Sequence, residues 1–144
     1  MGDVRADAQQ KARPRGPGSM PLSPHLQIWR WHVTMLASIL TRATGVALYV
    51  GALIVVGLAL SLALGPDAYG AYTAVLGSWL GKLVLFGLTV SIFYHLAAGL
   101  RHLAFDSGAG FQPKTADMTA VACIAFAVVA SLGVWAAAIV AGVA

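Results

Sequence analysis

Apolar side chains fill long stretches of the chain, and charged side chains mark where those stretches stop. The stretches without any charged residue are 43–66, 68–81, 83–100 and 118–144. A helix that crosses a membrane needs about 20 apolar residues, so the first and last stretches are each long enough alone. The two middle stretches make one further helix if it begins near Tyr72, includes Lys82 and ends within 102–105. The pattern therefore predicts three membrane-spanning helices.

Turn-forming residues separate these three predicted helices. Gly-Pro-Asp at 65–67 stands between the first and the second, and two glycines and a proline within 108–113 stand between the second and the third. Both connections are short and rich in residues that break helices. We therefore expect an all-α integral membrane protein, with a basic N-terminal arm at 1–30 and a three-helix transmembrane domain at 31–144.

Composition supports a membrane protein and excludes several other classes. Hydrophobic residues make up 59% of the chain and charged residues 10%, whereas a soluble domain has about 25% charged residues. The chain has no glutamate, which excludes chemistry by paired glutamates, and the single Cys123 excludes a disulfide framework. The excess positive charge lies mainly in the N-terminal arm, without interleaved aromatic residues, so it favours a lipid surface over nucleic acid.

The distribution of lysine and arginine predicts the orientation in the membrane. These residues concentrate in the N-terminal arm, and Arg101 and Lys114 flank the second connection, while the first connection and the C-terminus have none. Positively charged loops remain on the cytoplasmic side. We therefore expect a cytoplasmic N-terminus and a periplasmic C-terminus.

Polar residues gather on one face of the second predicted helix. Ser91, His95, Gly99 and His102 fall within about 80° of each other at 100° per residue, and Arg101 follows at the level of the lipid head groups. An imidazole, a glycine that admits a flat ligand and cationic groups for carboxylates would suit haem b. The alternative is a hydrogen-bonded histidine at a helix contact, with Gly99 as a packing notch. With haem, a second axial ligand would have to come from another chain.

A second polar set lies near the start of the first predicted helix. Ser38 and Arg42 are four residues apart and share a face, and Arg42 is the only charge within 31–66. A hydroxyl and a guanidinium there could bind the carbonyl of a quinone, or the arginine could reach lipid phosphates. His25 and His32 lie closer to the interface, where we expect them to anchor the chain.

Three segments resemble the cytochrome b subunit of succinate dehydrogenase, complex II. The segments are PLSPHLQIWR at 21–30, SILTRATG at 38–45 and HLAAGLRHLAFD at 95–106. The last is similar to that family's haem signature, His-x-x-x-Gly-x-Arg-His-x-x-x-Asp. The resemblance extends over roughly residues 20 to 140, with three spans in matching order.

The resemblance implies a subunit of a four-chain enzyme, with no catalytic residue in this chain alone. Its partners would be a flavoprotein with FAD, an iron–sulfur protein with Fe–S clusters and a second small membrane anchor. Electrons from succinate would reach ubiquinone at the cytoplasmic face of the membrane. One haem b would sit between the two anchors. Alanine-rich and glycine-rich composition suggests a bacterial inner membrane.

The same resemblance assigns site residues. The implied haem-binding residues are His95, as the iron ligand, together with Gly99, Arg101 and His102; the implied quinone-binding residues are Ser38 and Arg42. The family usually has Ser-x-x-His-Arg, and this chain has Thr41 in place of the histidine. The titratable group is thus absent from that position.

Two other functions fit parts of the pattern. A fumarate reductase anchor that uses menaquinone would have the same features in this chain. A three-helix scaffold without a cofactor would have the apolar helices but no absorption in the visible range. A reduced-minus-oxidised spectrum with b-type α and β bands would exclude the scaffold.

Overall fold

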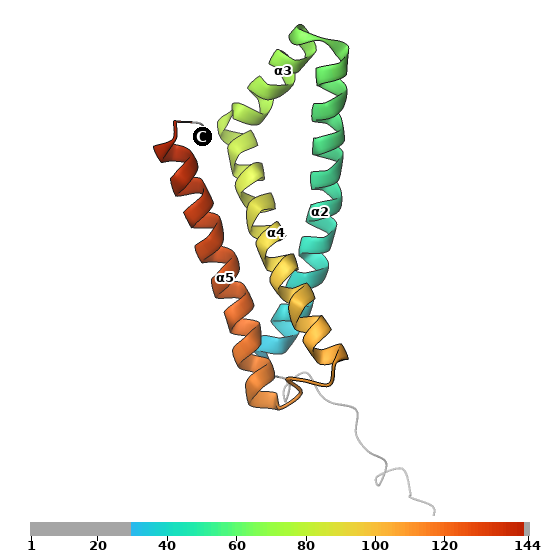
Figure 1. Ribbon diagram of the computed structural model, residues 1–144, viewed down its shortest axis with the longest axis vertical. Coiled ribbons are helices and arrows are strands. Elements are labelled where there is room, and N and C mark those ends of the chain that lie inside the picture. Colours follow the sequence, from blue (N-terminus) through green and yellow to red (C-terminus); the bar gives the residue numbers. More distant parts are fainter. Residues whose placement is uncertain (1–29, 143–144) are drawn as a thin grey trace, which may run out of the picture. The chain divides into compact units, whose positions relative to one another are not determined.

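The computed structural model describes residues 30–142, and these residues form helices joined by short connections (Figure 1). The helices are α2 (Val33–Leu64), α3 (Pro66–Gly77), α4 (Trp79–Asp106) and α5 (Pro113–Val140). No strand occurs in this described range. α2, α4 and α5 are long and apolar enough to cross a membrane, which confirms the predicted all-α fold with three transmembrane helices.

The predicted N-terminal arm at 1–30 lies almost wholly outside the described residues, so the division at residue 30 remains a prediction. His25 also lies outside them. His32 is described and stands at the N-cap of α2, with an exposed side chain. α2 begins at Val33, ten residues before the charge-free stretch 43–66, because the single Arg42 does not interrupt the helix.

The first connection begins as predicted, but the second transmembrane helix does not. Gly65 has a φ of 112°, a left-handed conformation that glycine adopts without strain, and Pro66 opens α3. We expected the second span to begin near Tyr72, and this was wrong. Tyr72 belongs to α3, where its hydroxyl donates a 2.8 Å hydrogen bond to the carbonyl of Ile54 on α2. The second span begins only at Trp79.

Ser78 separates α3 from α4 by a local capping arrangement. Its backbone is extended, with φ −63° and ψ 161°, and its Oγ accepts a 3.1 Å hydrogen bond from the amide of Gly81. A serine oxygen in this position satisfies one of the free N–H groups at the start of a helix. The chain also passes close to itself here, because a side chain at Gly81 would overlap the carbonyl oxygens of Val75 and Leu76.

We therefore expect Gly81→Ala to destabilise the protein. The added methyl group meets backbone atoms, which cannot move aside as a flexible side chain could, and such overpacking costs about 1–3 kcal/mol. Thermal unfolding of the detergent-purified protein should show a lower midpoint. Gly70→Ala, on the exposed side of α3 with open space around it, is the matched control and should leave the midpoint unchanged or slightly raised. Equal midpoints for the two variants would contradict the close approach of the backbone at Gly81.

The second connection has the residues that were expected to break the helix. α4 ends at Asp106, Gly108 and Gly110 both have a φ of 85°, and Pro113 opens α5. The break between the second and third spans is thus confirmed.

α4 packs against both α2 and α5, and α2 also contacts α5. In Figure 1 α4 lies between the other two in the upper part of the view and crosses α2 in the lower part. Tyr94 on α4 donates a 2.7 Å hydrogen bond to the carbonyl of Ala37 on α2, and Trp135 on α5 donates a 3.3 Å bond to Thr89 Oγ1 on α4. The buried apolar residues are mostly small: Ala37, Tyr94, Ala98, Ala120 and Ala127. Small side chains let helix backbones approach closely inside a membrane. The contact between α2 and α4 positions the histidine described next.

Candidate functional site

His95 lies half-buried where α4 meets α2. Its Nδ1 is 3.2 Å from Oγ1 of Thr44, which is itself 9% exposed. A methyl group at Gly45 would lie 3.4 Å from Cε1 of His95, so the ring occupies the space next to this glycine. Thr44 and Gly45, two consecutive residues of α2, thus face one edge of the imidazole. Thr44 lies within the segment at 38–45 that carries the family resemblance, but the sequence did not identify it as the partner of His95.

The other ring nitrogen of His95 is available. Within residues 30–142 Nε2 has no hydrogen-bond partner, and no buried side-chain nitrogen or oxygen there lacks one. Nε2 is therefore accessible from outside the helices. One turn further along α4, Gly99 is exposed and has no atom within 4 Å of the place a side chain would occupy. This face of α4 offers an imidazole nitrogen beside an open glycine.

These features fit an iron porphyrin better than a metal ion held by side chains alone. No group of three or more histidine, cysteine or acidic residues in the described range lies close enough to hold a metal ion. A porphyrin supplies four nitrogens of its own, so the protein needs to give only an axial ligand. A single accessible imidazole beside an uncrowded backbone meets that requirement.

His102 lies on the same side of α4 and is exposed. Its Nδ1 is 2.6 Å from the carbonyl oxygen of Ala98, an acceptor, so Nδ1 carries the proton of this hydrogen bond. The opposite ring nitrogen then faces outward. The structure thus brings His95, Gly99 and His102 to one open face, as the helical spacing predicted.

Arg101 is directed elsewhere. Its Nε donates to Thr119 Oγ1 at 3.0 Å and its Nη2 donates to the carbonyl of Ala116 at 3.1 Å, both on α5. The guanidinium carbon lies 4.4 Å from the centre of the Phe105 ring. Arg101 stands about 120° around α4 from His95 and connects α4 to α5. Its expected role beside the porphyrin carboxylates remains a prediction.

Ser38 and Arg42 are exposed on α2, and neither has a hydrogen-bond or ion-pair partner among residues 30–142. They lie about 120° and 160° around the helix from Thr44, which faces α4. Thr41, between them in sequence, donates to the carbonyl of Ala37 at 2.8 Å. The serine and arginine therefore share a face of α2 that residues 30–142 leave exposed, and this face does not include Thr44, which contacts His95.

Comparison with known proteins bears on this arrangement. The family described as succinate dehydrogenase/fumarate reductase transmembrane subunit matches residues 13–134, a range that includes α2, α3, α4 and most of α5. The chain belongs to this family. Membership confirms the resemblance drawn from the three sequence segments and accounts for three apolar helices in one short chain.

The individual proteins to which the chain is similar are named as cytochrome b subunits of succinate dehydrogenase. The chain is 40% identical over 112 residues to the succinate dehydrogenase cytochrome b556 subunit of Paracoccus denitrificans, covering 78% of this chain and 86% of that protein. It is 33% identical over 115 residues to the corresponding subunit of Rickettsia felis, covering 80% and 90%. It is 33% identical over 118 residues to the mitochondrial cytochrome b560 subunit of Sus scrofa, covering 78% and 68%.

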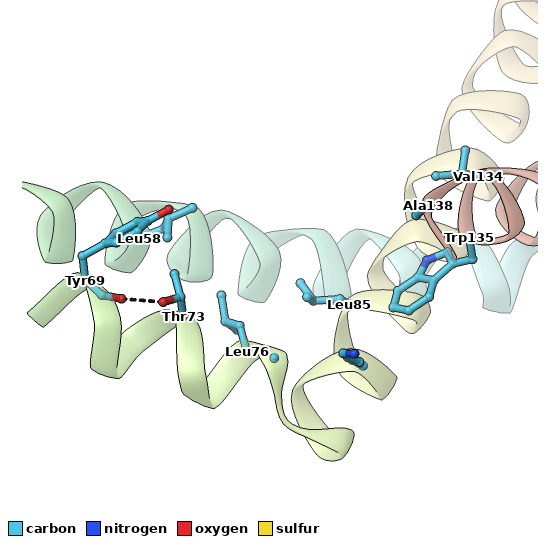
Figure 2. Close-up of a pocket in the computed structure, with 10 residues that line it drawn as sticks. Leu58, Tyr69, Thr73, Leu76, Leu85, Val134, Trp135 and Ala138 are labelled. Atoms are coloured by element: carbon cyan, nitrogen blue, oxygen red, sulfur yellow. Dashed lines mark hydrogen bonds between the residues drawn. The ribbon is translucent and has the colours of Figure 1, made fainter. Parts of the chain in front are cut away.

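A separate cavity of about 430 Å³ lies near the other end of the transmembrane helices of this family member. It is lined by Leu58, Tyr69, Thr73, Leu76, Gly77, Lys82, Leu85, Val134, Trp135 and Ala138. Figure 2 shows Trp135 and Tyr69 on opposite sides of it, with the Thr73 hydroxyl bonded to the Tyr69 carbonyl at 2.8 Å. None of the predicted site residues lines this cavity, which is mostly apolar.

Proposed function

We propose that the chain is the cytochrome b membrane-anchor subunit of a succinate:quinone oxidoreductase. The observation that best supports this is the His95 face, where α2 holds one ring nitrogen and leaves Nε2 accessible beside Gly99. Family membership and the names of the relatives agree with it. The chain contributes anchoring and binding groups, and oxidation of succinate takes place on partner subunits.

In this proposal His95 would be the iron ligand that the chain gives to one haem b. When bound, the haem would accept and release single electrons. Gly99 leaves room for the edge of the macrocycle. His102 can donate to a propionate from its outward nitrogen as an imidazolium, in which both ring nitrogens carry protons. Arg101 uses Nε and one N–H of Nη2 to bond α5, so only its remaining N–H groups could donate to a propionate. The second iron ligand would come from a partner anchor, because His102 stands on the same helix and face as His95 and His32 stands at the N-cap of α2.

Ser38 and Arg42 form this chain's part of the quinone site. Both are exposed on a face that the described residues 30–142 leave uncovered, so in this proposal a partner subunit excludes water there. A guanidinium and a hydroxyl can each donate to a quinone carbonyl oxygen. Charge-assisted hydrogen bonds of this kind strengthen as negative charge develops on that oxygen.

The proposed assembly consists of this chain, a second small anchor, an iron–sulfur subunit and a flavoprotein, in the bacterial cytoplasmic membrane. The proposed orientation puts the N-terminus and the α4–α5 connection on the cytoplasmic side, because Arg101 and Lys114 flank that connection. His95 and Arg42 both lie toward this end of their helices, so haem and quinone would be bound nearest the soluble subunits.

Purification from detergent-solubilised membranes tests the assembly. We expect an affinity-tagged chain to bring down a second anchor and two larger soluble subunits, with FAD and b-type α and β bands in the reduced-minus-oxidised spectrum. If the haem is shared between chains, this chain alone would expose polar groups to lipid, and a partner helix must bond to them. Recovery of a folded single chain with a full complement of haem would contradict the shared site. A complex without visible absorption would support the cofactor-free scaffold instead.

A further inference from the structure

Oγ1 of Thr44 stands at the centre of three contacts. It lies 2.8 Å from the carbonyl oxygen of Leu40, 3.1 Å from that of Thr41 and 3.2 Å from Nδ1 of His95. A hydroxyl has one proton and two lone pairs, and a carbonyl oxygen can only accept. The proton therefore goes to the α2 backbone, where the shortest contact is. Toward His95, Oγ1 is left as an acceptor.

An acceptor at this place determines the tautomer of His95. Nδ1 must carry a proton to donate to Oγ1, and a neutral imidazole protonated at Nδ1 has its lone pair on Nε2. The opposite tautomer would set a lone pair of Nδ1 against a lone pair of Oγ1, unless Thr44 gave up its backbone bond. Nε2 is also the nitrogen that is accessible from outside the helices, so the lone pair points where a ligand can reach it.

The ring orientation is fixed by the same stretch of α2. Cε1, the carbon between the two nitrogens, faces Gly45. A methyl group added at Gly45 would lie 3.4 Å from Cε1, an ordinary van der Waals distance. Next to His95, Tyr94 donates at 2.7 Å to the carbonyl of Ala37, about two helical turns before Thr44. This second bond holds the two helices in register. Thr44 therefore meets the imidazole in a defined position.

We propose that Thr44 is a positioning residue for haem binding: by giving its own proton to α2, it holds His95 with the lone pair on Nε2. This inference rests on the proposed function, since it concerns the ligand that the proposal assigns. An acceptor for the N–H of the ring nitrogen that does not bind the metal makes a ligating imidazole a stronger donor, and loss of such a partner typically costs about 10–100-fold in affinity.

The test compares Thr44→Val with Thr44→Ser in the purified complex. Valine has nearly the shape of threonine but no hydroxyl. We expect Thr44→Val to bind haem about 10–100-fold more weakly, measured as haem per flavin during dilution or competition with apomyoglobin. The haem that remains should have a higher midpoint potential, because a weaker donor stabilises ferric iron less. Thr44→Ser, which keeps the hydroxyl, should resemble the wild type in both measurements.

Thr41→Val is the matched control, because Thr41 also bonds a backbone carbonyl of α2 but does not contact His95. We expect it to leave haem affinity and potential unchanged. Equal losses in the Thr41 and Thr44 variants would overturn the inference, since they would indicate a general effect on α2. If Thr44→Val does not assemble with the flavoprotein, Thr44→Ala removes the same hydroxyl without β-branching and is compared in its place.

A His95→Ala variant separates this inference from the function on which it rests. Loss of haem from His95→Ala, with wild-type haem affinity and potential in Thr44→Val, would overturn the role of Thr44 alone. Retention of haem by His95→Ala would overturn the proposed ligand itself.

Discussion

His95→Ala should abolish the low-spin b-type spectrum of the complex. Its Nε2 is accessible one helical turn from the open Gly99, and its Nδ1 is held by Thr44 at the contact between α2 and α4. Alanine removes one of the two axial ligands, and five-coordinate haem loses the sharp α band of a bis-histidine site or leaves the protein altogether. The measurement is the reduced-minus-oxidised spectrum, normalised to the flavin that copurifies.

The helices should still pack in this variant. Tyr94 continues to bond Ala37, and Thr44 keeps its bond to the Leu40 carbonyl, so a folded subunit without normal haem is the expected product. His32→Ala is the control, since His32 is exposed at the N-cap of α2 and away from the α2–α4 contact. His25→Ala is expected to behave in the same way. Loss of haem from His32→Ala, with retention in His95→Ala, would show that the ligand has been misassigned.

The transmembrane helices could be predicted because charge is so scarce in this chain. A stretch such as 118–144 without charge is long enough to span a bilayer, and glycine and proline at 65–66 end a helix whatever surrounds them. The start of α4 could not be predicted in this way. Residues 72–81 are as apolar as a helix interior, and only the extended backbone of Ser78 and the close passage at Gly81 reveal a break. Hydropathy does not register such local geometry.

The candidate site shows a similar division. Helical periodicity places His95, Gly99 and His102 on one face, because angles within a helix follow from sequence separation alone. Which helix lies against His95 depends on packing, so the contact between Thr44 and His95 was not foreseen. One signal was present in α2: Ala37 and Thr44 are seven residues apart and share a face, the face that packs on α4. The direction of Arg101 toward Thr119 likewise depends on how α5 packs on α4.

Arg42→Leu should lower quinone reduction far more than succinate oxidation. Arg42 is exposed on α2 without a partner among residues 30–142, and Ser38 lies one turn away on the same face. A hydrogen bond from a charged donor contributes about 1.5–3 kcal/mol, which corresponds to roughly 10–100-fold in turnover with quinone. A soluble artificial acceptor takes electrons before they reach the membrane, so that rate should persist. The ratio of the two rates is the quantity to measure.

Two substitutions test whether the geometry of the guanidinium matters. Arg42→Lys should recover only part of the ratio, because an ammonium is a point charge without the planar pair of donors. Thr41→Ala should change it little, since the Thr41 hydroxyl is already bonded to the Ala37 carbonyl and cannot exchange protons as an imidazole could. Haem content should be normal in all three variants, because none of these side chains contacts His95. An unchanged ratio in Arg42→Leu would mean that the arginine binds lipid phosphate, and the quinone would then be held by the partner subunits alone.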